Sequence, residues 1–237
     1  PQAVTQLPGQ NPATPGAAAS STPIQHPIDK AIAGDDDGAP LPALDASDAA
    51  VLAALATLAG GGLNDILNPE HVIQRIVATI DSLPRQKVAA DAMPVRGAQG
   101  AFIARQTGNE REIDARNAAR YAGYAHIAQA IDTKALVAWY AHYYSLFQEA
   151  YRELGYPDGY FNDRLVAVID HLLQTPDANG AAALTQPKVM YEYADPALES
   201  RSAGQKLLLR SGPENEAAIK AKLREIRAAI TGETLPR

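Results

Sequence analysis

A broad aromatic stripe runs along residues 132–154, DTKALVAWYAHYYSLFQEAYREL. Its side chains recur at steps of three or four residues, which places them on one face of an α-helix, and Trp139, Tyr143 and Leu146 widen that face. So wide a face predicts a single long helix at the centre of the fold. A row of aromatic residues can also line a ligand cleft, although core packing is its more common use. The members of the stripe are Leu136, Tyr140, Tyr144, Phe147, Tyr151 and Leu154.

The rest of the chain predicts an all-α fold, a compact bundle of six or seven helices. Alanine supplies much of the 46% hydrophobic content, and an alanine-rich sequence with few β-branched runs favours helix. One stretch departs from helical spacing: Val189, Tyr191 and Tyr193 alternate with other residues, which predicts a strand paired with residues 101–104. We therefore expect at most a small two-stranded β element. Helices are expected at residues 45–58, 69–80, 117–131, 132–154, 163–174, 196–209 and 213–230.

Several of these helices begin with residues that commonly satisfy free backbone N–H groups. Asn68 is expected to cap the second helix, with Pro69 at its first position. Asn162 is expected to cap the helix that starts at Asp163. The run Ser211-Gly212-Pro213-Glu214 has the pattern of a capping box before the last helix.

The composition divides the chain into three parts. Residues 1–44 are rich in Pro, Ala and Gly and have few core-forming side chains, so we expect a disordered linker. Residues 45–232 are expected to form the helical domain, and residues 233–237 a flexible tail. No run approaches the roughly 18–20 apolar residues of a membrane span. Because the sequence begins at Pro1 rather than Met, we expect a longer protein with a targeting or anchoring segment ahead of this part.

Charge and cysteine content argue against several classes of protein. The formal net charge of -6 argues against a general nucleic-acid binder, which needs a basic surface. A basic face on the last helix, formed by Lys220, Lys222, Arg224 and Arg227, keeps nucleic-acid binding open as an unlikely third interpretation. The absence of cysteine excludes disulfides, thiol nucleophiles and zinc–thiolate sites.

Catalytic and cofactor motifs are absent from the sequence. There is no H-E-x-x-H, G-x-S-x-G, Walker A or G-x-G-x-x-G pattern. None of the five histidines has a His or carboxylate three or four residues away in a recognised metal-binding pattern. We therefore expect no metal site and no cofactor.

The stretch LGYPDGYFNDRL, residues 154–165, offers the most polar groups per residue. Asp158 and Asp163 could form a carboxylate pair for acid–base chemistry, with Arg164 as an electrostatic clamp and Tyr156 or Tyr160 as proton donor. Each residue type also has a structural use, because this stretch ends one helix, turns and starts the next. Both interpretations stay open at this stage, and these five residues are the candidate binding residues.

A second candidate is an anion site at Arg210, Ser211 and Gly212. The amino end of a helix carries partial positive charge and free N–H groups, and Arg210 lies next to it. The alternative is a turn between two helices with no ligand.

Three runs of the sequence resemble an uncharacterised bacterial family, the three-thousand-and-fourteenth domain of unknown function. They are PEHVIQRIVATIDSLPR, LFQEAYRELGYPDGYFNDRLVAVIDHLLQTP and QPKVMYEYADPALESRSAGQKLLLRSGPENEAAIKAKLREIRAAI, and the likeness covers approximately residues 48–230. The resemblance implies a proteobacterial envelope protein with one N-terminal membrane helix, a Pro/Ala-rich linker and this domain in the periplasm. It assigns no catalytic residue.

These observations lead to two hypotheses of different classes. The first is a membrane-tethered periplasmic helical domain that binds another envelope component, protein or polymer, without catalysis, and meets the membrane only through its N-terminal anchor. The alternative is an envelope-associated hydrolase or lyase that uses the carboxylate, tyrosine and arginine cluster at residues 156–164.

Overall fold

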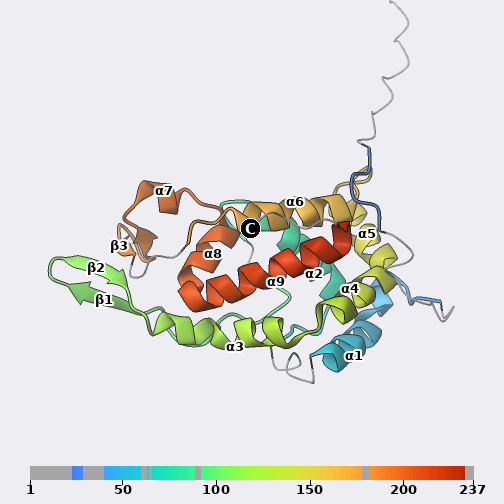
Figure 1. Cartoon of the computed structure of the whole chain (residues 1–237), viewed down its shortest axis with the longest axis horizontal. Coiled ribbons are helices and arrows are strands. Elements are labelled where there is room, and N and C mark those ends of the chain that lie inside the picture. The colour runs from blue at the N-terminus through green and yellow to red at the C-terminus, as the bar shows by residue number, and fades with distance from the viewer. Residues whose placement is uncertain are drawn as a thin grey trace, which may run out of the picture.

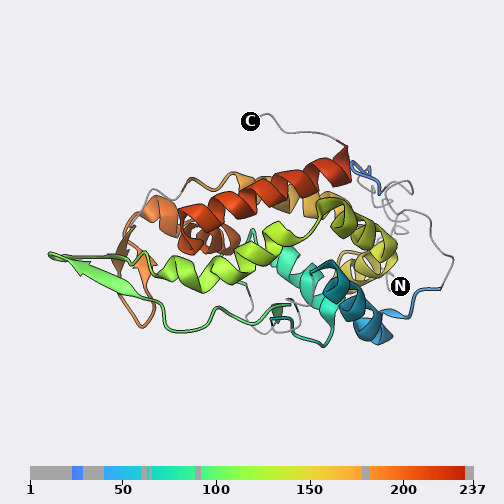
Figure 2. The same cartoon turned by 60° about the horizontal axis from the view of Figure 1, so that its bottom comes forward.

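The last helix, α9 (Pro213–Thr231), runs through the middle of the helical array. In the computed structural model it packs against α3 (Asn117–Ala130), α4 (Thr133–His142), α6 (Phe161–Leu173) and α8 (Ala203–Ser211). Figure 2 shows α9 and α3 side by side along the length of the molecule. The structure describes residues 23–28, 40–59, 63, 66–88, 92–177 and 182–232.

A second group of helices surrounds α2 (Val72–Ser82). This helix packs against α1 (Asp48–Leu58), α5 (Tyr144–Glu153) and α6. Since α6 contacts both α2 and α9, it joins the two groups. A short 3-10 helix, η1 (Leu44–Ala46), precedes α1, and a single turn, α7 (Pro196–Glu199), precedes α8.

The expected single helix over residues 132–154 is divided in two at Tyr143. Tyr143 leaves the helical region with ψ 7°, and its N–H donates to the Trp139 carbonyl as the C-cap of α4. The two halves pack against different neighbours, which one straight helix does not allow. Helix α4 packs against α1 and α9, whereas the second half, α5 (Tyr144–Glu153), packs against α2 and α6. The aromatic stripe is nevertheless core: the Tyr140 and Phe147 rings lie 5.1 Å apart, and Phe147 stacks on Phe161 at 5.7 Å.

The expectation of an all-α fold is wrong, because a four-stranded antiparallel sheet lies at one end of the molecule (Figure 1). The strand order is β1-β2-β3-β4, and the strands are β1 (Ala104–Thr107), β2 (Glu110–Ile113), β3 (Ala183–Thr185) and β4 (Glu192–Tyr193). Together with the nine α-helices of the described part, this makes a mixed fold of helices and an antiparallel sheet, and not a bundle with at most two strands.

The expected strand pairing is also wrong. Residues 189–194 contribute only the two residues of β4, which pair with β3 in the register Leu184↔Tyr193. Strand β1 pairs with β2 through Ala104↔Ile113, in a hairpin that turns at Gly108, where φ is +61°. The sequences ARQT and EREI are mostly exposed and polar, so they lack the alternation of apolar residues that signals a strand.

The capping residues expected from the sequence are replaced by groups from other parts of the chain. Helix α2 begins at Val72 rather than Pro69, and the Asp48 carboxylate of α1 accepts the N–H groups of His71 and Val72 at 2.7 and 2.8 Å. Asn68 instead donates to the Met93 carbonyl. The local sequence favours Asn68 as the cap of α2, whereas the carboxylate of Asp48, more than twenty residues earlier, accepts the free N–H groups.

The other two expected caps differ in the same way. Gly212, not Ser211, is the N-cap of α9, and it makes no side-chain cap. The Ser211 hydroxyl donates to the Leu208 carbonyl, so the capping box does not form. Helix α6 starts at Phe161, which places Asn162 inside the helix.

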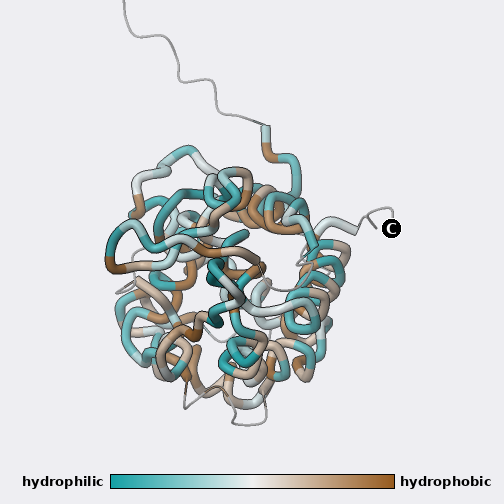
Figure 3. Tube along the Cα trace, turned by 90° about the vertical axis from the view of Figure 1, so that its left-hand side faces the viewer, coloured by the Kyte–Doolittle hydropathy of each residue, from teal (hydrophilic) through white to brown (hydrophobic). Residues whose placement is uncertain are grey.

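The main core lies between the two helical groups, and a smaller apolar cluster lies under the sheet. Val51, Val72, Ile73 and Phe161 are fully buried in the main core. Leu184, Tyr193 and Leu209 of α8 form the centre of the cluster beneath the sheet. Figure 3, viewed along the long axis from the end with the sheet, shows hydrophobic and hydrophilic residues alternating along the helices.

Part of the segment expected to be a linker lies on the domain. Leu44 is 3% exposed, Leu41 packs against the main core, and residues 23–28 contact the amino end of α6. The other residues of the range 1–44, namely 1–22 and 29–39, lie outside the described residues, as does the expected tail at 233–237.

Two helical glycines provide a matched test of this packing. A Cβ at Gly204 in α8 would lie 2.7 Å from Leu172 Cδ2 and 3.1 Å from the Leu83 carbonyl oxygen, whereas a Cβ at Gly123 in α3 meets nothing within 4 Å. We expect Gly204→Ala to lower the free energy of unfolding by about 1–3 kcal/mol through overpacking. Gly123→Ala should raise it by about 0.5–1 kcal/mol, because alanine is the better helix former. Urea unfolding of both variants measures the difference, and equal effects would contradict the described packing of α8.

Candidate functional site

The stretch 154–165 forms a helix end, a turn and a helix start, as its structural interpretation expects. Gly155 takes the left-handed conformation with φ +112° after α5. Gly159 does not have positive φ; it is needed because a Cβ there would lie 2.8 Å from the Tyr151 ring. The Tyr151 and Tyr156 rings stack at 4.6 Å, which fixes the path of the turn. Asp158 is exposed at its tip.

Two of the candidate residues, Tyr156 and Arg164, meet at the buried carboxylate of Asp81 in α2. The Arg164 Nε donates to Asp81 Oδ1 at 2.9 Å, and its Nη2 donates to the Asp81 carbonyl oxygen at 2.7 Å. The Tyr156 hydroxyl donates to Asp81 Oδ2 at 3.3 Å and accepts from Arg85 Nη2 at 3.0 Å. Arg85 also pairs directly with Asp81. We call these four residues the Asp81 cluster.

The sequence contained a signal for Asp81 that motif searches do not use. Asp81 follows Ile73 and Val77 at steps of four residues, so it lies on the face of α2 that is otherwise core. Its side chain is 4% exposed. A carboxylate on a core face requires a cationic partner, because burying an unpaired charge is costly.

The other two interacting candidates, Tyr160 and Asp163, bind the segment Pro23–Ile28, which we call the docked segment. The Asp163 carboxylate accepts the N–H groups of Gln25, at 3.0 Å, and of His26, at 2.7 Å. The Tyr160 hydroxyl accepts the N–H of Ile28 at 2.9 Å. In Figure 1 the docked segment, in blue, lies beside the end of α6 that is nearest α5.

The helix α5 supports this arrangement by satisfying the first N–H groups of α6. Gln148, which is 7% exposed, accepts the Phe161 N–H at 3.0 Å and donates to the Gly159 carbonyl at 2.8 Å. The Tyr144 hydroxyl accepts the Asn162 N–H at 3.3 Å. Burial raises the pKa of Tyr144 well above its usual value, and a hydrogen bond with Tyr160 adds to the effect. Tyr144 therefore stays neutral at physiological pH.

The five candidate residues thus do not meet at one point. Tyr156 and Arg164 belong to the Asp81 cluster, Tyr160 and Asp163 contact the docked segment, and Asp158 is exposed in the turn. Among the described residues, the structure gives no hydrogen bond or ion pair between the side chains of these two groups. The geometry does not bring Asp158 and Asp163 together as a carboxylate pair.

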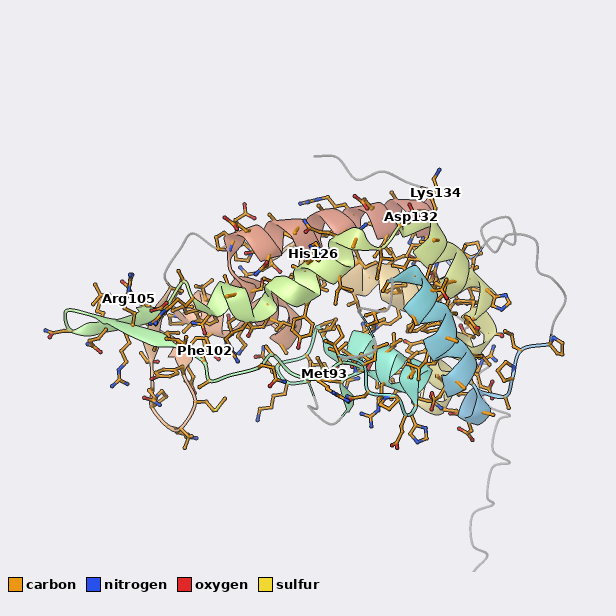
Figure 4. All side chains as sticks on the ribbon, turned by 90° about the horizontal axis from the view of Figure 1, so that it is seen from below. Met93, Phe102, Arg105, His126, Asp132 and Lys134 are labelled. Carbon is orange, nitrogen blue, oxygen red and sulfur yellow. The ribbon has the colours of Figure 1, made fainter. Side chains whose placement is uncertain are left out.

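The expected anion site lies at the opposite end of the molecule. Arg210 and Gly212 line a cavity of about 770 Å³ between the sheet and the amino ends of α3 and α9. In Figure 4 this end of the molecule is marked by Arg105 on the hairpin and Phe102 at its base. Asp132 and Lys134, at the start of α4, lie far from it. Ser211 is not part of the lining, because its hydroxyl is directed to the Leu208 carbonyl.

The charges around this cavity do not favour an anion in particular. The Arg210 guanidinium lies 5.5 Å from the centre of the Tyr193 ring, and its Nε is buried with no hydrogen-bond partner among the described residues. Burial raises the pKa of Tyr193 to about 12, although Arg210 opposes that shift. Four carboxylates and two arginines line the space: Asp114, Asp177, Asp195, Glu214, Arg105 and Arg210. The anion site therefore stays a prediction.

The basic residues of α9 are largely occupied by partners within the chain. Lys220 is 4% exposed and pairs with Glu216 at 2.6 Å and with Asp177 at 2.9 Å. Lys222 pairs with Glu225, and Arg227 pairs with Asp170 at 2.6 Å. Arg224 is exposed. Three of the four cations expected to form a basic face are thus held in internal ion pairs, which leaves little positive surface for phosphates.

Two further searches cover the part of the chain that the structure describes. In it, no group of three or more His, Cys, Asp or Glu residues is placed to bind a metal ion. None of the described helices is both long enough and apolar enough to cross a bilayer.

Removal of the Asp81 carboxylate tests whether the Asp81 cluster stabilises the fold. Asp81→Ala leaves Arg164, whose side chain is 29% exposed, without its buried partner, and we expect a loss of about 3 kcal/mol in the free energy of unfolding. The matched control is Asp177→Ala, since Asp177 is 89% exposed in its pair with Lys220 and should contribute far less to stability. Chemical denaturation measures both, and similar losses would contradict the assigned role of Asp81.

Asp114, at the edge of the cavity, gives a test by pH. Hydrogen bonds from the Arg116 side chain and backbone lower the pKa of Asp114 from its ordinary 3.8 to about 2. Because the folded-state pKa is depressed, its contribution to stability is present above pH 4 and is lost as the pH falls towards 2. In Arg116→Met the pKa should move back towards 3.8, as followed by NMR titration of the carboxyl carbon. Arg105→Met, which removes a weaker and more distant charge, should shift it less.

Comparison with known proteins gives one match. Residues 72–227 match the family described as "Protein of unknown function (DUF3014)". Neither the curated proteins nor the solved structures contain a significant match. The matched range begins at α2 and ends within α9, so it includes the sheet, the Asp81 cluster and the amino end of α6. It also covers more than half of the chain, and the resemblance seen in the sequence is confirmed: the protein belongs to the DUF3014 family, a family of unknown function.

Proposed function

We propose that the protein is a non-catalytic binding domain of the bacterial cell envelope, tethered to the inner membrane through a segment ahead of Pro1 and facing the periplasm. Its ligand is another envelope component. The observation that supports binding is the use of the polar residues at 156–164: two stabilise the fold around Asp81, and two bind the backbone of a peptide segment. Binding the backbone of a peptide segment is a recognition task and needs no reaction.

The alternative, an envelope hydrolase or lyase, finds less support in the geometry. It requires Asp158 and Asp163 to act on one substrate with a tyrosine or Arg164 close by. Asp163 instead binds the docked segment, Arg164 binds Asp81, and Asp158 is exposed. The residues needed for that reaction have separate partners.

The proposed location rests on the sequence and on the family resemblance. Residues 1–44 have the Pro/Ala/Gly-rich composition of a tether. A cysteine-free chain is compatible with an oxidising compartment, since it has no thiols to mispair. The negative charge and the internal pairing of Lys220, Lys222 and Arg227 direct the choice of partner away from nucleic acid.

Fractionation of cells that make the full-length protein tests the location. We expect the protein in the membrane fraction, and we expect protease added to spheroplasts to digest the domain while cytoplasmic markers stay intact. Recovery of the protein wholly in the soluble cytosol would contradict the proposal.

In-cell crosslinking of the same full-length protein tests binding against catalysis. We expect a discrete crosslinked complex with an envelope component, and the complex should be unchanged in Asp158→Asn, because Asp158 makes no contact that the binding proposal uses. The hydrolase or lyase alternative predicts that Asp158→Asn abolishes the enzymatic activity of the protein. Loss of that activity in Asp158→Asn, with the crosslinked complex retained, would therefore favour the enzyme.

A further inference from the structure

Every available backbone N–H group from Gln25 to Ile28 donates to a side chain at the amino end of α6. Pro27 has no N–H, and the other three N–H groups reach Asp163 or Tyr160 at 2.7–3.0 Å. The His26 carbonyl accepts from Asn162 Nδ2 at 2.8 Å. Four backbone groups of the docked segment, whose backbone bends at Gln25 and His26, are thus satisfied by three side chains, which is recognition of a peptide through its main chain.

These side chains are available because α5, and not α6 itself, satisfies the start of α6. A carboxylate in the first turn often caps its own helix, but Gln148 and Tyr144 accept the N–H groups of Phe161 and Asn162. Asp163 is therefore free to face the docked segment.

Asn162 is fixed in the orientation that the docked segment needs. Its Oδ1 accepts from the Tyr140 hydroxyl at 3.2 Å, which directs its Nδ2 towards the His26 carbonyl. Asn162 is 0% exposed. A buried amide donor without an acceptor is costly, so this position favours a backbone carbonyl at that point.

The docked segment adds one apolar anchor to these polar contacts. Ile28 packs against the main core, whereas Ile24 is 54% exposed. Pro27 restricts its own φ and the backbone of His26, which lowers the entropy lost on docking. The features that matter are therefore a backbone bent so that two successive N–H groups converge, a proline and an apolar residue after it.

From this geometry we propose that the amino end of α6 is a binding site for a polypeptide segment of this pattern. The occupant in this structure is the chain's own docked segment, and a segment with the same pattern competes with it. The site consists of Tyr160, Asn162 and Asp163, with the apolar contact of Ile28 beside them. This inference deepens the proposed binding function and rests on it for the biological role of the peptide.

Amide hydrogen exchange of the purified full chain tests the contact within the chain. We expect the amides of Gln25, His26 and Ile28 to be protected, and Asp163→Ala to speed exchange at Gln25 and His26 roughly tenfold to a hundredfold, because a charged acceptor is lost. Asp158→Ala makes the same substitution at an aspartate five residues earlier, outside the site, and should leave the exchange rates of these amides unchanged. Equal exchange of these amides in the wild type, Asp163→Ala and Asp158→Ala would overturn the proposal.

Binding between molecules is tested on a full chain whose own segment is weakened. In Ile28→Ser the apolar anchor is lost, and we expect a fluorescent peptide of the sequence TPIQHPID to bind this variant saturably. The peptide should bind at least tenfold more weakly when Asp163→Ala is added, and a scrambled peptide should not bind. Absence of binding to Ile28→Ser, in a protein that still unfolds cooperatively, would falsify the peptide site. These measurements use purified protein, so peptide binding can fail while the cellular location is confirmed. Equally, peptide binding can be confirmed while the proposed location fails.

Discussion

The buried carboxylate of Asp81 is the interaction on which the arrangement of α2, α6 and the turn between α5 and α6 depends. A single charge that is 4% exposed receives Arg164 from α6, Arg85 from the end of α2 and Tyr156 from the turn. Because a buried charge must be paired and hydrogen-bonded, these contacts fix how α6 lies across α2. Since α6 also packs against α9, the position of the helices around α9 follows from the same contact.

Asp163 and Arg164 show how neighbouring residues at one helix start serve two purposes. Successive positions on an α-helix point about 100° apart, so two adjacent side chains face different surroundings. Arg164 faces the interior and binds Asp81, while Asp163 faces the docked segment. A stable scaffold on one side thereby holds a recognition surface on the other, and residues on a rigid helix are placed more accurately than residues on a loop.

The sequence predicted the parts that depend on local pattern. The extent of the last helix, expected at residues 213–230 and observed at Pro213–Thr231, and the end of α5 before Gly155 agree with spacing and turn chemistry. The sheet was missed because β1 and β2 are short and exposed and gain their pairing from each other and from β3. The α2 cap and the partner of Arg164 were missed for a related reason, since Asp48 and Asp81 make contacts far along the chain. The docked segment was missed because its recognition uses backbone groups, which leave no side-chain pattern.

Recognition through backbone groups has a consequence for affinity and selectivity. A segment in the same chain is present at an effective concentration on the order of millimolar, so modest intrinsic affinity is enough to keep it bound. A competing segment on another molecule must overcome that advantage, either through tighter contacts around the Ile28 position or through its own high local concentration at a membrane surface. Selectivity then comes from the few side chains that reach the domain, namely the proline that restricts the backbone and the apolar residue that packs against the core. Because Asp163 supplies a negative charge where two N–H groups converge, acidic side chains at those two positions would be disfavoured. The site thus discriminates by charge and shape at specific points while tolerating many sequences elsewhere.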